Sequence, residues 1–332
     1  MDKGGNMAGI VMHHHFGKVV YSALPEEVKN VLNNVNLYDY GTTCPDSFTY
    51  VNFINHKSLK ENQSFATYVH THKTKDYFVK LIEIAKVDYN MFNYLCGNIT
   101  HYFLDVFTNP FIYYSSGVYI PSQESTIIYR GLKTRLERAM DCYVIENYYD
   151  SKVNSFNITN RILKLRRISK HSKESLDRLY LSVYGKNDGY KYVNSSIKWQ
   201  RRYYQLIFDP FGLKNKIFSK KDDGVSYNDY QQVSFYNKDV NTNEIDIFNF
   251  NRNEWYNPVD KDMVSNDSFF DLLDKAKKMA VNCINDLYKS IFGNETFDFD
   301  LYFKDLSYIT GVPCSYDLEM KFFNIIFKKD LF

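Results

Sequence analysis

Apolar residues recur with helical spacing over the first 150 residues of the chain and again after residue 266. In the earliest such stretch Ser22 stands as a helix cap and Pro25 lies near the first turn. Apolar residues then follow at the i, i+3, i+4 and i+7 positions of a helix, at Val28, Val31, Leu32 and Val35. The same spacing predicts helices that open at Thr74 and at Asp88, that run from about Gln123 to Tyr149, and that begin near Asn266.

The helix predicted to begin at Asp88 and to run to about Phe107 is apolar on nearly every side. A helix without a polar face is buried by its neighbours, so we expect this one to be central. By contrast, residues 185–262 mix Asn, Asp, Lys, Tyr and Ser with aromatics without a sustained period, and we expect long loops with short elements there.

Composition places the chain among folded, soluble proteins, because 44% of its residues are apolar and 24% are charged. The formal charge of +2 is too small to recruit a polyanion by a general field. Five cysteines without CxxC spacing suit reduced thiols. The apolar run 7–12 is too short for a signal peptide core, and no stretch approaches the ~20 apolar residues of a membrane span. We therefore expect a cytoplasmic protein.

His101 and Asp105 are the most informative polar pair, because they lie four residues apart on one face of the predicted central helix. A buried carboxylate without a partner costs several kcal/mol. Either the two side chains bond each other or they bind a metal ion.

Other side chains with suitable chemistry lie elsewhere in the chain. They are His13, His14, His15, Asp46, His70, His72, Glu137 and Asp141. Imidazole and carboxylate donors together suit zinc or another borderline divalent ion. Each of these residues alone also has a structural explanation, as part of a surface histidine run, a turn or a solvated helix face.

The order of these motifs resembles the zinc-dependent phospholipase C superfamily, an all-helical fold that also includes fungal single-strand nucleases. The similar segments are His13-His14-His15-Phe16-Gly17, 41–48 with Pro45-Asp46, 95–105 with His101-Tyr102 and Asp105, Asn109-Pro110, Asn249, 255–258, Ser268-Phe269 and 306–311. The resemblance implies an all-α multi-helix bundle formed by one domain over 1–332, with a variable, loop-rich insertion at 151–245.

The resemblance also implies a set of zinc ligands. A first zinc would take Asp46, His101, Asp105 and either His72 or His70. A second would share Asp105 as a bridge and add His13 or His14. Of the ligands of a third zinc only Glu137 is retained, because Asn109 and Lys133 stand where the family has histidines. Two zinc ions are therefore expected, and Lys133 could form an ion pair with Glu137 at i, i+4 spacing.

The function that this resemblance implies is hydrolysis of a phosphoester such as a phospholipid, with peripheral membrane contact. A di-zinc centre would activate the water, and Asp46 would steer or deprotonate it as the catalytic carboxylate. Two alternatives stay open: a catalytically degenerate, metal-stabilised interaction protein, and a nuclease that acts on nucleic acid. Basic residues of the run 161–173 could hold anionic headgroups or a phosphate backbone, although most such runs are solvated helix faces.

Overall fold

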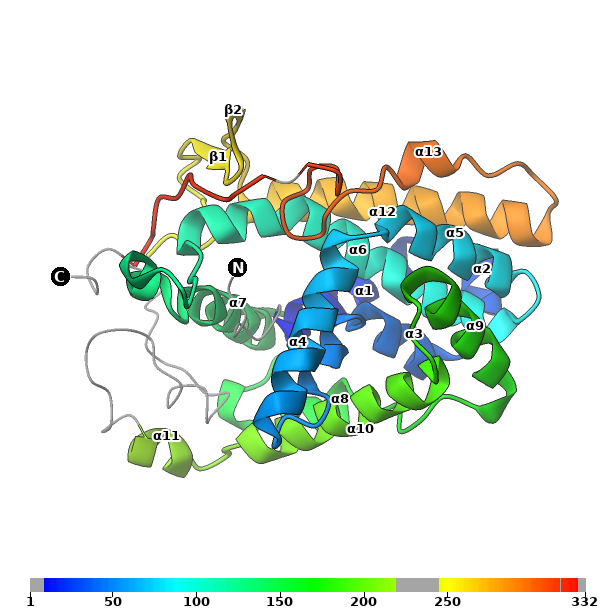
Figure 1. Ribbon diagram of the computed structural model, residues 1–332, viewed down its shortest axis with the longest axis horizontal. Helices are drawn as coiled ribbons and strands as arrows, with labels where there is room; N and C mark the ends of the chain where they lie inside the picture. Colours follow the sequence, from blue (N-terminus) through cyan, green and yellow to red (C-terminus); the bar gives the residue numbers. More distant parts are fainter. Residues whose placement is uncertain (1–8, 219–244, 317, 328–332) are drawn as a thin grey trace.

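The computed structural model describes residues 9–218, 245–316 and 318–327. Helices dominate these residues, and the described strands form one small two-stranded sheet (Figure 1). The prediction of an all-α fold is confirmed. No described helix combines the length and the apolar character that a membrane crossing requires.

The helices of the first half carry the residues of interest. They are α1 (Ile10–Ala23), α2 (Glu26–Val31), α3 (Val35–Thr42), the 3-10 helix η1 (Asp46–Tyr50), α4 (His56–Thr71), α5 (Thr74–Ala85), α6 (Tyr89–Ser116), η2 (Glu124–Tyr129) and α7 (Leu132–Tyr148). The remaining elements are η3 (Val153–Ser155), α8 (Ile158–Arg161), η4 (Lys170–Ser172), α9 (Lys173–Tyr184), α10 (Gly189–Ile207), α11 (Leu213–Phe218), β1 (Trp255–Asn257), β2 (Asp260–Ser265), α12 (Phe269–Phe292) and α13 (Phe299–Tyr302). Strands β1 and β2 pair antiparallel, with Trp255 opposite Ser265.

Helix α6 is the central helix that the sequence predicts. The Asp88 side chain caps it by accepting a hydrogen bond from the Asn90 N–H, and nearly all of its side chains are buried. It runs past Phe107 and through Pro110 to Ser116, so it is longer than predicted. Helices α3 and α12 pack along it, and α12 lies beside it along one edge of the molecule in Figure 1.

Glycines let α3 and α6 approach each other at backbone contact distance. A Cβ atom on Gly97 would lie 2.2 Å from the carbonyl oxygen of Tyr38, and one on Gly41 would lie 2.7 Å from that of Tyr94. No larger residue fits without moving a backbone. This contact brings the end of α3 against the middle of α6, where His101 lies.

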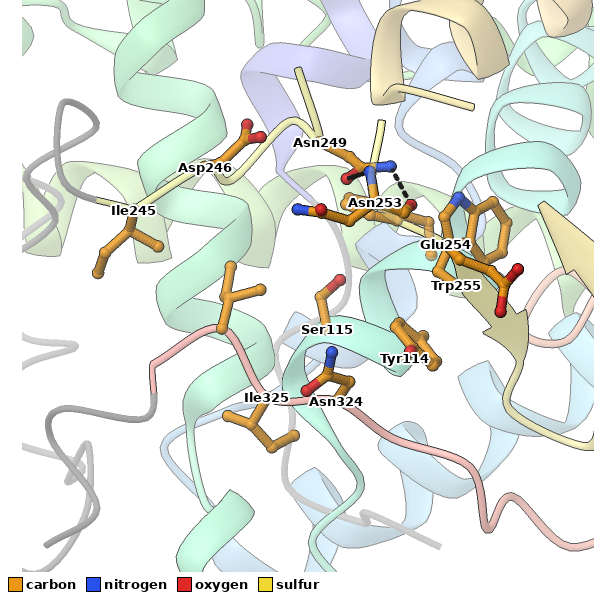
Figure 2. Close-up of a pocket in the computed structure, with 12 residues that line it drawn as sticks. Tyr114, Ser115, Ile245, Asp246, Asn249, Asn253, Glu254, Trp255, Asn324 and Ile325 are labelled. Atoms are coloured by element: carbon orange, nitrogen blue, oxygen red, sulfur yellow. Dashed lines mark hydrogen bonds between the residues drawn. The ribbon is translucent and has the colours of Figure 1, made fainter. Parts of the chain in front are cut away.

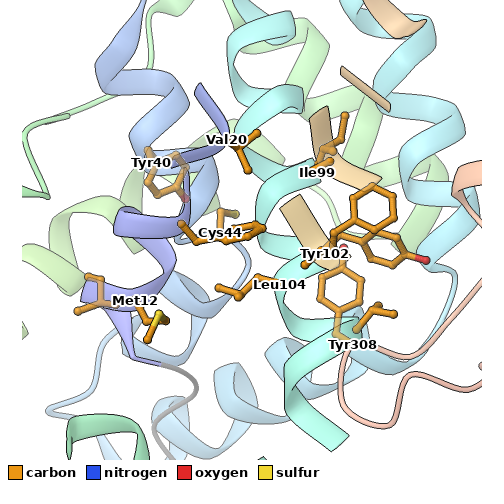
Figure 3. Packing of buried hydrophobic residues seen from close by; sticks show 14 of the residues in the cluster. Met12, Val20, Tyr40, Cys44, Ile99, Tyr102, Leu104 and Tyr308 are labelled. Carbon is orange, nitrogen blue, oxygen red and sulfur yellow. The ribbon is translucent and has the colours of Figure 1, made fainter. Parts of the chain in front are cut away.

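Aromatic residues fill much of the core around α6. Tyr102 and Tyr308 have ring centroids 5.0 Å apart, and both are almost fully buried (Figure 3). The same view shows Met12 of α1 and Leu104 of α6 among the buried side chains. Apolar residues from Ile10 to Phe327 belong to this one cluster.

The predicted limits of two helices are wrong. Ser22 caps nothing, because it lies inside α1 and its hydroxyl donates to the carbonyl of Lys18. The apolar positions from Val28 to Val35 belong to two helices, and the Asn34 side chain caps the second by accepting from the Leu37 N–H. The predicted 123–149 helix is likewise divided into η2 and α7 at Gly131, whose φ of 78° is left-handed.

The prediction of long loops over 185–262 is wrong for 189–207, which form α10. Its buried positions recur at helical spacing, with Val193, Ile197, Tyr204 and Ile207 beside Ser196 and Gln200. Helix α9 lies in the predicted loop-rich insertion as well. The part of both predictions at 219–244 lies outside the described residues.

Candidate metal centre

Four buried side chains from three helices converge beside the middle of α6. They are Asp46 at the start of η1, His70 in the last turn of α4, and His101 and Asp105 on α6. Each offers one donor atom, and the four atoms all lie within 4.8 Å of one another. Donors at this spacing can bind a single metal ion.

The distances within this group are short for atoms that carry lone pairs. Asp46 Oδ1 lies 3.0 Å from His70 Nε2, and Asp105 Oδ2 lies 3.2 Å from His101 Nε2. The Nε2 atoms of His70 and His101 are themselves 3.5 Å apart. Two carboxylates and two imidazoles at these distances require a cation between them, either a proton or a metal ion.

Backbone carbonyls determine which nitrogen of each imidazole faces this group. The Nδ1 atom of His70 donates to the carbonyl of Ala66 at 2.6 Å, and that of His101 donates to the carbonyl of Thr42 at 3.0 Å. A carbonyl only accepts, so each Nδ1 carries hydrogen and leaves Nε2 to face the carboxylates. Ligating histidines in metal sites are oriented in this way.

Asp105 connects this group to a third histidine. Its Oδ2 faces His101, while its Oδ1 lies 3.1 Å from the Nε2 of His13 on α1. The Nδ1 of His13 donates to the carbonyl of Gly9 at 3.1 Å, so His13 follows the same pattern as the other two. The two oxygens of one carboxylate thus face two donor sets, which suits a bridging ligand.

The ionisable side chains of this cluster shift the pKa values of their neighbours. Burial opposes ionisation of Asp105, but His101 and His13 outweigh burial and hold the pKa of Asp105 well below its usual range. Burial also opposes ionisation of Asp46, whose pKa His101 and His70 nevertheless lower. Burial opposes protonation of His13, yet Asp105 raises the pKa of that imidazole to about 9. Both carboxylates are therefore held as anions, which is the form that binds metal.

The structure separates the two histidine alternatives of the sequence. His70 lies in the group, whereas His72 is exposed and stacks on Tyr68 with ring centroids 4.4 Å apart. His13 faces Asp105, whereas His14 turns to the other side of α1, where its Nε2 lies 3.5 Å from Asp39 Oδ2. His15 packs on Tyr148.

Glu137 forms a buried ion pair with Lys133 on α7, as the sequence predicted. The ammonium also lies over the ring of Tyr113, 5.1 Å from its centroid. Burial raises the pKa of Glu137 to about 7 although Lys133 opposes this. A cavity of about 20 Å³ lies between Glu137 and His13, with Asp105 and Asn109 also in its wall.

Two further residues hold the group in place: Asp141, which the sequence offered as a candidate metal ligand, and Tyr308, to which the sequence analysis gave no role. The Asp141 carboxylate accepts hydrogen bonds from the N–H groups of Val11 and Met12 at 3.2 and 2.8 Å, so it caps α1 and orients His13. Tyr308 packs edge-on against His70, with ring centroids 5.0 Å apart, and its N–H donates to the His70 carbonyl. Tyr308 lies in the segment 306–311, which resembles a motif of the family, and this resemblance could have pointed to it.

A larger cavity of about 260 Å³ lies near the far end of α6 (Figure 2). Tyr114 and Ser115 line it, about 14 Å along the helix from Asp105. The Asn249 amide, which also lines it, donates to the carbonyls of Asn253 and Asp267. None of the candidate metal ligands lines this cavity.

Comparison with known proteins identifies the family. The family model for zinc dependent phospholipase C matches residues 12–198, which is more than half of the chain. Neither the curated proteins nor the solved structures give a match. The chain belongs to the zinc dependent phospholipase C family.

Proposed function

We propose that this member of the zinc dependent phospholipase C family is a metal-dependent phosphoester hydrolase with two zinc ions. Asp46, His70, His101 and Asp105 would hold the first ion, and Asp105 and His13 would contribute to the second. One observation carries the proposal: three imidazoles donate Nδ1–H to backbone carbonyls and direct Nε2 at two buried carboxylates.

The donor set fits zinc, because imidazole nitrogens and carboxylate oxygens are its common ligands. A buried oxygen supports the same assignment. Asp46 Oδ1 is buried away from water and faces the Nε2 atoms of His70 and His101, at 3.0 and 3.9 Å. Such an atom is costly to bury unless a cation neutralises it.

Bound zinc supplies Lewis-acid stabilisation of phosphoryl oxygens and lowers the pKa of water toward ~7. The chain itself supplies geometry, because the carbonyls of Gly9, Ala66 and Thr42 hold the three imidazole rings. Asp46, on the short helix η1 at the edge of the group, would accept the proton of the attacking water at its carboxylate. The Lys133 ammonium adds a fixed positive charge beside Asp105, where the family would hold a third ion.

The experiment pairs two histidines that lie two residues apart. Elemental analysis should find two zinc ions in the wild type and in His72→Ala, and fewer in His70→Ala. The wild type and His72→Ala should hydrolyse a chromogenic phosphodiester, and chelator should stop both. Asp46→Asn removes one charge at constant size and should lower the rate by about 10²- to 10⁴-fold. Equal metal loss in His70→Ala and His72→Ala would contradict the proposed ligand set.

A non-catalytic, metal-stabilised protein is the second candidate, and burial favours it. All five proposed ligands are 5% exposed or less, and the cavity beside them has room for about one water molecule. Metal-loaded protein that is inert toward phosphocholine esters, other phosphodiesters and single-stranded nucleic acid would establish this candidate. It would equally exclude the nuclease.

Two further expectations remain proposals. The described residues include all five cysteines as thiols rather than disulfides, which supports a reducing compartment such as the cytoplasm. Apolar residues from α1 to the C-terminal segment share one core cluster, which supports a single domain over 1–332.

A further inference from the structure

Positive charge is concentrated in one part of this chain. Residues 151–218 carry fifteen Lys and Arg against four Asp and Glu, whereas the whole chain carries 41 against 39. The rest of the chain therefore has 26 basic against 35 acidic residues, and a net charge of −9 opposes +11 in this segment. The small total charge conceals a strong asymmetry.

Helix α10 arranges part of this charge in one line. Lys191, Lys198, Arg202 and Leu206 follow one another at spacings of seven, four and four residues, so they share one face of the helix. All four are exposed. The opposite face of α10, with Val193 and Ile197, is buried.

An extended segment lies along the flank of α10 and adds more cations. Its backbone is attached to the helix, because the Ile168 N–H donates to Asn194 and the Tyr190 hydroxyl donates to the Ile168 carbonyl. Its apolar residues Ile162 and Ile168 are buried. Its basic residues are exposed, namely Arg161, Lys164, Arg166, Arg167 and Lys170.

These cations have few acidic neighbours in their own segments. Across 151–173 and 189–217 the only acidic residue is Asp209, and it is 6% exposed. We call the exposed basic residues of α10 and of 161–170 the basic face. Surface charges of one sign at this density create a potential that attracts anionic surfaces.

An apolar tip continues the basic face beyond the end of α10. The exposed fractions are 59% for Leu206, 84% for Phe211, 60% for Leu213 and 60% for Ile217. Lys214 holds the tip against the helix by donating to the carbonyl of Phe208 at 2.9 Å. Figure 1 shows α11 at the outer end of α10, on the edge opposite α12. Large apolar side chains grouped at the surface mark interaction sites.

We propose that the basic face and the apolar tip together form a docking surface for a membrane that contains anionic phospholipids. The cations would lie over the headgroups, and Leu206, Phe211, Leu213 and Ile217 would insert at the boundary of the acyl chains. Interfacial segments of peripheral proteins combine these two features. A nucleic acid would use the cations but would leave the exposed aliphatic side chains without a partner. This proposal does not rest on the hydrolase function.

The test is sedimentation of the full chain with vesicles at low and at high salt. The chain should bind phosphatidylcholine vesicles that contain phosphatidylserine, and added salt should weaken binding. Lys198→Gln with Arg202→Gln should weaken it about thirtyfold, since each charge near an anionic surface contributes about fivefold. Phe211→Ser with Leu213→Ser should weaken it about tenfold or more.

The control variant is Lys86→Gln with Lys278→Gln. It removes two exposed charges, one at the end of α5 and one on α12, and should bind like wild type.

Circular dichroism of each variant checks that it is folded. Folded wild type that does not sediment with anionic vesicles would overturn the proposal. Equal loss in the control pair would also overturn it, because binding would then follow total charge. Two other results would replace it: binding of single-stranded nucleic acid without vesicle binding, or a dimer in solution that Phe211→Ser abolishes. Because no turnover is measured, an inactive enzyme that binds vesicles leaves the proposal intact.

Discussion

The candidate metal centre and the basic face differ in how their charges are surrounded. In the candidate metal centre, two carboxylates and two imidazoles are buried as one group, His13 adds a third imidazole beside Asp105, and backbone carbonyls hold the rings. On the basic face, exposed cations project from one helix and one extended segment with few acidic neighbours. Buried charge must be neutralised where it lies, whereas exposed charge is screened by water and salt. Substitutions in the two regions should therefore differ in their cost to folding.

The largest effect is expected for His101→Ala in the metal centre. The substitution leaves Asp105 and Asp46 buried with one fewer partner, and breaking a buried pair costs about 3–5 kcal/mol. Denaturant unfolding should show this loss, and elemental analysis should show lost metal. His72→Ala, on an exposed ring, is the matched control and should change neither. A stable, metal-loaded His101→Ala variant would show that the centre does not support the fold.

Lys133→Met tests the buried ion pair and should cost about 2–4 kcal/mol. The variant leaves Glu137 buried without its cation, and the pKa of Glu137 is already about 7 with Lys133 present. A carboxyl whose folded pKa lies above its unfolded value loses stability as the pH rises between the two values. The loss in Lys133→Met should therefore be larger at pH 8 than at pH 5, as measured by urea unfolding at both pH values. A loss independent of pH would indicate a packing defect instead.

Gly97→Ala tests the backbone contact that positions His101. The added Cβ would lie 2.2 Å from the Tyr38 carbonyl oxygen, so α3 and α6 must separate, at a cost of about 1–3 kcal/mol. Because the Thr42 carbonyl holds His101, zinc affinity should fall as well. Gly185→Ala is a useful comparison, since its Cβ would meet nothing within 4 Å and only its left-handed φ of 66° is strained. Zinc affinity that falls equally in both variants would refute the positional role of Gly97.

The smallest effect is expected on the basic face. Lys198→Gln with Arg202→Gln should change the free energy of unfolding by less than about 0.5 kcal/mol for each substitution, because both side chains are exposed. Thermal unfolding of the folded variant measures this directly. A loss as large as that of Lys133→Met would erase the distinction between the two regions.

The local pattern of apolar and polar residues was sufficient to predict several parts of this structure. The helix over Thr74–Ala85, the cap at Asp88 and the burial of α6 follow from residues close together in the sequence. The pairing of His101 with Asp105 follows too, because four residues make about one helical turn. The ion pair of Lys133 with Glu137 has the same origin.

Tertiary structure decided which of the neighbouring histidines face the buried carboxylates. His70 lies in the last turn of α4 and faces Asp46, whereas His72 follows the end of the helix with extended backbone and points to solvent. His13 and His14 are adjacent, so they project about 100° apart on α1, and the packing of α1 against α6 selects His13. The excess of basic residues in 151–218 is present in the sequence, but its arrangement on one face depends on α10. The prediction of loops there is wrong although Val193, Ile197 and Ile207 recur at helical spacing, because Ser196 and Gln200 interrupt the apolar run on that face. A sequence specifies which groups are available, and packing determines their direction, because direction depends on contacts between residues far apart in the chain.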